Sequence, residues 1–157
     1  MISFERSFDY GQIKSIITHQ RIYPFVSDDF SPAPADYRPL ESEKVWHVLV
    51  KDDAEVLGLW ILVPENEICW KIHTCLLPNS WGERAKQAAK LLAKWIWENT
   101  PCLRVITDVP EYNRVALKFA KEAGLAEFGV NEESFMKNGE LHDQIMLGIS
   151  KPKAGAL

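Results

Sequence analysis

The sequence has no run that approaches the ~20 consecutive apolar residues needed to cross a bilayer. Its start, Met1 to Arg6, lacks the basic stretch and apolar core of a secretory signal peptide. Basic residues are in the minority, with 18 Lys and Arg against 22 Asp and Glu. The sequence therefore predicts a cytoplasmic protein with no membrane partner and no broad nucleic-acid-binding face.

Cysteine is also scarce, and the three cysteines lack the spacing of a zinc site or of a secreted disulfide framework. Cys69, Cys75 and Cys102 lie in apolar runs, so we expect buried free thiols. On one strand, Cys69 and Cys75 would be roughly 20 Å apart at ~3.3 Å per residue, too far for a disulfide. No residue set has the pattern of a metal cluster, a Ser-His-Asp triad or a P-loop.

What is present is the composition of an ordinary globular protein, with 46% hydrophobic and 25% charged residues. A chain of 157 residues suits one compact domain. We expect this domain to span residues 1–150. Small and polar residues then predict a disordered tail at 151–157.

The N-terminal part predicts a strand followed by two helical pieces. Residues 2–7 alternate apolar and polar side chains, and Asp9 suits a helix N-cap. Apolar residues at helical spacing mark the two pieces, with Ile13, Ile16 and Ile17 in the first and Tyr23, Phe25, Val26 and Phe30 in the second. Pro32 and Pro34 stop the second piece, because proline lacks an amide donor, and a loop to about Lys44 follows.

The rest of the chain alternates between strand and helix patterns. Apolar runs predict strands at 45–51, 56–63 and 68–77, the first two joined by a tight turn at Asp52-Asp53. A helix at 81–99 carries its apolar stripe on Ala85, Ala88, Ala89, Leu92 and Ile96. The remaining elements are a strand at 103–109, a helix at 113–123 closed by Gly124, and strands at 134–137 and 141–149 around Asn138-Gly139.

Two segments carry a specific pattern in addition to this order of elements. Residues 76–86 read apolar-x-Pro, then two residues, then a loop with Gly82 that opens the long helix. Downstream, Asn113, Ala116 and Gly124 have the spacing of a second characteristic helix, and Asp143 falls in the last strand. In these features the chain resembles the GCN5-related N-acetyltransferase (GNAT) family. The resemblance implies an α/β (α+β) fold, with a mixed, mostly antiparallel sheet of about seven strands flanked by about four helices.

The resemblance also implies acetyl-CoA as cofactor. Its pyrophosphate would bind the amides at the N-terminus of the long helix, where the helix dipole favours anions. The residues placed at this site by the resemblance are Leu76, Leu77, Trp81, Gly82, Glu83, Arg84, Ala85, Lys86 and Asn113. Asn113 equally suits a helix N-cap.

The loop departs from the family at two positions, because Arg84 and Lys86 stand where the family has small residues. Either both cations replace close backbone contact with ionic contacts to phosphate, or the loop has lost its ligand and they are solvated charges. Two positions are also possible for the tryptophans Trp60, Trp70 and Trp81, which either line an acceptor groove or belong to the core.

Amine acylation needs a base for the substrate ammonium and an acid for the departing thiolate. By the resemblance, Glu67 and His73 are the candidate bases, although a structural histidine remains an alternative. The family's tyrosine acid is replaced by Ala120, so Tyr112 is the candidate acid, with a packing role as the alternative.

Two functions therefore remain open from the sequence. The first is an N-acyltransferase that transfers an acetyl group from acetyl-CoA to an amine, either a small amine or a protein N-terminus or lysine. The second is a non-catalytic GNAT-like binding protein with a partner protein, similar to the phage-encoded members linked to head assembly. The sequence gives no indication of the oligomeric state.

Overall fold

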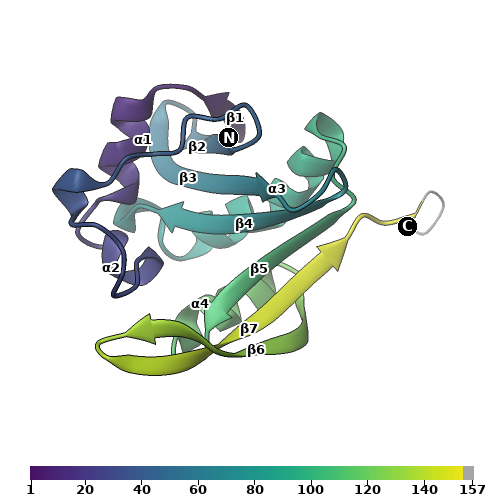
Figure 1. Ribbon diagram of the computed structural model, residues 1–157. Helices are drawn as coiled ribbons and strands as arrows, with labels where there is room; N and C mark the ends of the chain where they lie inside the picture. Colours follow the sequence, from purple (N-terminus) through teal and green to yellow (C-terminus); the bar gives the residue numbers. More distant parts are fainter. Residues whose placement is uncertain (154–157) are drawn as a thin grey trace.

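One seven-stranded sheet organises the backbone, with strand order β1-β2-β3-β4-β5-β7-β6 (Figure 1). The computed structural model describes residues 1–153. The strands are β1 (Ile2–Ser7), β2 (Trp46–Asp52), β3 (Glu55–Pro64), β4 (Cys69–Leu76), β5 (Arg104–Pro110), β6 (Ala126–Lys137) and β7 (Glu140–Ser150). Within the described residues all neighbouring strands are antiparallel except β4 and β5, which run parallel. The predicted mixed, mostly antiparallel sheet is confirmed.

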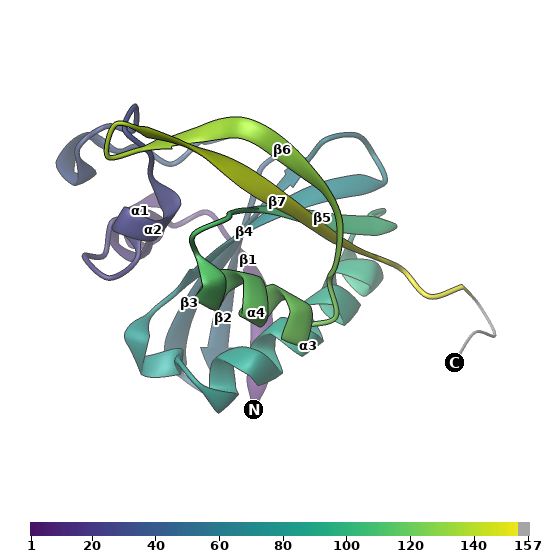
Figure 2. The same cartoon turned by 90° about the horizontal axis from the view of Figure 1, so that it is seen from below.

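Helices cover both faces of this sheet, as Figures 1 and 2 show from two directions. They are α1 (Tyr10–Ile17), α2 (Tyr23–Val26), α3 (Glu83–Asn99) and α4 (Arg114–Glu122), with short 3-10 turns η1 (Pro34–Asp36) and η2 (Pro78–Ser80). Helices α3 and α4 pack on one face, and α1 packs on the other. The predicted order of elements is confirmed. None of the described helices has the length and apolar character needed to cross a membrane.

The α3 face holds a core in which small side chains allow close approach. The predicted stripe of α3 is buried, at Ala85, Ala88, Ala89, Leu92 and Ile96. Trp60 and Trp70 are 1% and 4% exposed in the same cluster, so both are core residues rather than groove residues. Cys75 and Cys102 are buried free thiols as expected, whereas Cys69 is only half-buried.

The opposite face packs α1 against the central strands. Ile13, Ile16 and Ile17 form a second core cluster there, and Asp9 accepts a hydrogen bond from the Gln12 amide at 3.1 Å as the predicted N-cap. Helix α2 is shorter than expected and ends at Val26, because the backbone of Ser27 is extended. Phe30 lies outside α2 and is 81% exposed.

The C-terminal strands form the predicted hairpin, with positive φ at Asn138 (53°) and Gly139 (77°). Strand β6 begins at Ala126, eight residues earlier than the predicted start at Ser134. Its first half is largely exposed, and Gly129 and the polar run at 131–134 interrupt its apolar residues. The pairing with β7 also shifts register twice, between Glu127 and Gly129 and between Asn131 and Phe135. Of the predicted disordered tail, Lys151 donates its amide to the Leu103 carbonyl, and residues 154–157 lie outside the described residues.

Candidate functional site

The central strands β4 and β5 separate part of the way along their length. Their parallel register ends with Lys71 opposite Ile106. Beyond it the Thr107 hydroxyl donates to the Ile72 carbonyl at 3.0 Å, and the strands then diverge (Figure 1). In the described part of the chain, the edge of β4 up to Leu76 therefore has no strand partner on this side. An unpaired edge of this kind can hydrogen-bond an extended, amide-containing ligand.

Helix α3 begins beside this divergence with an uncapped turn. Gly82 is its N-cap, with φ 103° and ψ −136°, and makes no side-chain capping hydrogen bond. A Cβ atom at Gly82 would meet no atom within 4 Å, so the space next to the first turn is open among the described residues. Free amides and the helix dipole together favour an anion at this position.

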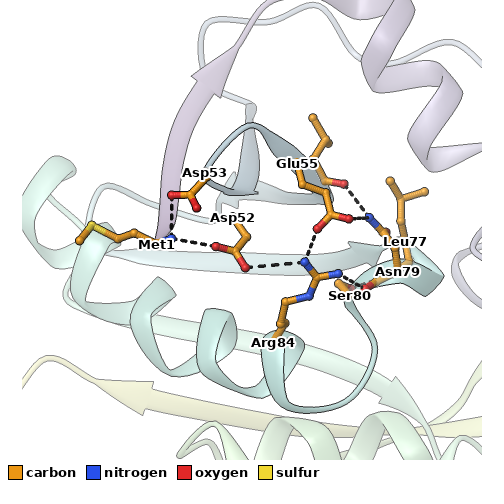
Figure 3. Close-up of polar contacts among 9 residues, drawn as sticks. Met1, Asp52, Asp53, Glu55, Leu77, Asn79, Ser80 and Arg84 are labelled. Atoms are coloured by element: carbon orange, nitrogen blue, oxygen red, sulfur yellow. Dashed lines mark hydrogen bonds and ion pairs between the residues drawn. The ribbon is translucent and has the colours of Figure 1, made fainter.

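Arg84 points from this turn toward the β2–β3 turn (Figure 3). Its guanidinium donates to the Glu55 carboxylate and to the Asn79 carbonyl, and it lies 3.6 Å from Asp52. The hydrogen bond from Arg84 lowers the pKa of Glu55. The cation predicted to contact phosphate is therefore engaged by carboxylates in this structure, and its phosphate role stays a prediction.

Lys86 has a different environment. Its ammonium lies 3.6 Å from Glu83 on the same helix and 3.6 Å from Glu122 on α4. Both contacts are long, and the Lys86 side chain is 41% exposed. Lys86 thus lies on the side of α3 that faces α4, where a ligand between the two helices would pass.

Trp81 occupies the end of β4. Its indole donates to the Leu76 carbonyl at 3.0 Å, and the Arg21 guanidinium lies 5.1 Å from its ring centroid. The ring is partly exposed, unlike those of Trp60 and Trp70. One acceptor on the unpaired edge of β4 is therefore already used by this side chain.

The two candidate bases do not lie together. Glu67 is exposed in the turn before β4, at the end where β4 and β5 are paired. His73 lies beyond the divergence and is exposed although it belongs to a central strand. The strand from Cys69 to His73 alone spans roughly 13 Å at ~3.3 Å per residue, and Glu67 lies two residues before it. Only His73 is beside the opening of the sheet.

Tyr112 lies against a histidine that sequence reasoning did not single out. The Tyr112 and His142 rings are 4.6 Å apart in an edge arrangement, and His142 Nδ1 is 3.2 Å from Glu111 Oε1. Desolvation raises the pKa of Tyr112. An open pocket is lined by Tyr112, Lys137, Asn138, Glu140 and His142. The predicted hairpin joins the other four residues, whereas no sequence signal connected Tyr112 to them, because the β5–β7 pairing brings it there.

Helix α4, the second characteristic helix, begins with a capping residue and lacks the family's tyrosine. Asn113 is the N-cap of α4, and its side-chain oxygen accepts from the Ala116 amide at 3.1 Å. Ala120, at the position of the family's tyrosine, is buried at 9% exposure. Gly124, with φ 100°, closes the helix as predicted.

Hydrogen bonds join the segment from α2 to Asp29 with the tip of the β6–β7 hairpin, which Figure 2 shows on the α1–α2 side of the molecule. The Asp29 carboxylate accepts from the amides of Asn138 and Gly139, both at 2.8 Å. The Lys137 ammonium donates to the carbonyls of Pro24 at 2.7 Å and Ser27 at 2.8 Å. These bonds hold the hairpin next to the α1–α2 side of the sheet.

The fold with this divergent sheet matches solved N-acetyltransferases. The spermidine N-acetyltransferase of Vibrio cholerae, in complex with CoA and spermine, has a TM-score of 0.79 over 95% of each chain at 16% identity. The ribosomal-protein-alanine N-acetyltransferase of Brucella melitensis has a TM-score of 0.57 over 68% of this chain and 69% of that chain at 13% identity. The predicted GNAT fold is confirmed, and at these identities the similarity concerns the fold.

No family model matches the sequence, and no curated protein matches it.

Proposed function

We propose that this protein is an acyltransferase that moves an acetyl group from acetyl-CoA to an amine. The observation that carries the proposal is the divergence of β4 and β5 beside the uncapped first turn of α3. The fold shared with N-acetyltransferases, one of them solved with CoA, supports the same function. We also propose that residues 1–150 form one domain, since one continuous sheet contains all seven described strands.

The residues present fit the two polar parts of the coenzyme. The free edge of β4 suits the amides of the pantetheine arm, which resembles an added strand. The amides after Gly82 suit the pyrophosphate. The Lys86 ammonium lies 3.6 Å from the Glu122 carboxylate on α4, a long contact that a phosphate oxygen can replace. Arg84 instead fixes the loop through its bond to the Asn79 carbonyl.

For the acceptor we propose a small cationic amine. The Vibrio cholerae neighbour was solved with spermine, which supports this class over a protein N-terminus or lysine. The carboxylates of Glu111 and Glu140 flank His142 near the opening, and negative charge attracts an ammonium group. The Brucella melitensis neighbour, named for a ribosomal protein, keeps a protein acceptor as the alternative to test.

Thermal unfolding with acetyl-CoA tests the coenzyme site directly. A ligand at 100 times its Kd should add ~2.7 kcal/mol to the free energy of unfolding. We expect Lys86→Gln to weaken acetyl-CoA binding about tenfold through one lost charged contact. Arg84→Gln should change it less than about threefold, because that guanidinium is bonded to Glu55. Absence of any shift at millimolar acetyl-CoA would refute the proposal.

A second candidate function is a non-catalytic binding protein, of which the phage assembly role is one form. The bond from Trp81 to the Leu76 carbonyl favours it, because it occupies an acceptor that an extended ligand would use. Ala120 in place of a tyrosine points the same way. Thermal stability unaffected by acetyl-CoA, in a folded protein, would favour this second function.

A further inference from the structure

His73 and Asp108 lie on the same face of the sheet, at the level where β4 and β5 separate. The parallel register ends with Lys71 opposite Ile106. Two more residues along each strand lead to His73 and Asp108. Side chains alternate along a strand, so His73 shares a face with Lys71, and Asp108 lies on that face because it contacts Lys71.

Asp108 is a carboxylate with only one oxygen satisfied. Its Oδ2 lies 2.8 Å from the Lys71 ammonium, and its side chain is 15% exposed. Its Oδ1 is buried and has no hydrogen-bond partner among the described residues. Buried polar side-chain atoms are nearly always hydrogen-bonded, and a catalytic role is one of the recognised explanations for an exception.

His73 is an exposed group on the neighbouring strand that can supply the missing donor. Its surroundings lower its pKa, first by desolvation and then through Lys71, while Asp108 and the turn residue Glu65 oppose this. The imidazole is therefore neutral at pH 7 and can take up a proton. In this form one ring nitrogen donates a hydrogen bond and the other accepts one.

We propose that Asp108 is the positioning residue of a proton-accepting pair with His73. Rotation of the His73 side chain gives Asp108 Oδ1 an imidazole N–H, which fixes the tautomer and leaves the other ring nitrogen free. Such a carboxylate also stabilises the imidazolium once a proton arrives. Lys71 keeps Asp108 in place through the ion pair.

The inference rests on the proposed acyl transfer and assigns its first proton. The ammonium group of the acceptor gives one proton to His73, which releases it to water. The acceptor nitrogen keeps the electron pair and attacks the thioester carbon with it. The C–S bond breaks as the new C–N bond forms. The second amine proton ends on the departing thiolate, so the charges and protons balance.

The pair can be tested without coenzyme or acceptor by following the His73 ring signals in NMR as the pH is changed. We expect Asp108→Asn to lower the pKa of His73 by about one unit, because the opposing negative charge is removed. Glu65→Gln is the matched control, since Glu65 also contacts Lys71, at 3.5 Å, but sits in the preceding turn. Equal shifts in both variants would overturn the proposal.

A measurement on the wild-type protein keeps the result independent of how Asp108→Asn folds, and a kinetic measurement then tests the catalytic role. In the wild-type protein, the ring nitrogen shifts of His73 should show a single tautomer, and an even mixture of tautomers would overturn the pairing. With acetyl-CoA and spermidine, the acidic limb of kcat/KM should move with the NMR pKa in Asp108→Asn and drop about tenfold or more at pH 7. If the acidic limb of kcat/KM does not move in Asp108→Asn, the catalytic role of the pair is overturned. Lack of acetyl-CoA binding would refute only the proposed function.

Discussion

Gly58 shows how closely β3 approaches the end of β4. A Cβ atom there would lie 2.4 Å from the Cys75 carbonyl oxygen and 2.7 Å from Leu76 Cα, and φ is +141°. We expect Gly58→Ala to lower the free energy of unfolding by about 2–4 kcal/mol, because backbone atoms would have to move. Urea denaturation measures this loss. Gly139→Ala is the control, with φ +77° but open space, and should cost about 1 kcal/mol. Equal losses would contradict the steric argument.

His47 makes the stability of the fold depend on pH. It is 2% exposed on β2, and burial, followed by the charge of Arg6, lowers its pKa. The unfolded chain takes up a proton near pH 6.5, whereas the folded chain does so only at lower pH. The free energy of unfolding should therefore fall as the pH drops below about 6.5, by at most ~1.4 kcal/mol per pH unit from this group.

Urea denaturation at pH 7, 6 and 5 checks this prediction. His47→Phe is the matched variant, because it keeps an aromatic ring next to Tyr10, whose ring centroid lies 6.0 Å from that of His47. The variant should lose stability less steeply on acidification. The same slope in both proteins would assign the pH dependence to other groups.

At the scale of elements, the hairpin and the loop after α2 act as one unit. The amides of Asn138 and Gly139 both donate to Asp29, and these bonds lower the pKa of the Asp29 carboxyl. Asp29→Ala should speed the hydrogen exchange of these two amides about tenfold, because they lose their acceptor. Glu140→Ala is the control, since that exposed side chain makes no bond to them in the described structure. Unchanged exchange in Asp29→Ala would show that the hairpin is held by other contacts.

The regular elements were predictable where their residues were periodic. The stripe of α3 and the cap at Asp9 were confirmed because both are set by neighbours in the sequence. The first half of β6 was missed because Gly129 and the polar run at 131–134 interrupt its apolar residues, and pairing with β7 completes the strand. Helix α2 was predicted too long, since the Ser27 hydroxyl bonds back to the Tyr23 carbonyl where the chain turns extended.

At the scale of the whole molecule, two buried thiols report on opening of the sheet. Burial raises the pKa of Cys75 to about 12 and that of Cys102 to about 11. Neither should react with an aromatic disulfide at pH 8 until the chain opens, because thiolate and access are both lacking. Absorbance of the released thiol should show at most the half-buried Cys69 reacting rapidly, with three thiols reacting in urea. Rapid reaction of all three in the native protein would contradict this packing.

The sequence by itself determined the order of elements and the turns, because helix periodicity, caps and glycines act over a few residues. It also indicated the loop after Pro78 that begins α3. Only the tertiary structure decided which charged groups meet there. Arg84 turns to Glu55, 29 residues away in the chain, and Asp108 on β5 pairs with Lys71 on β4. Such pairings depend on strand register, and register follows from how the whole sheet packs.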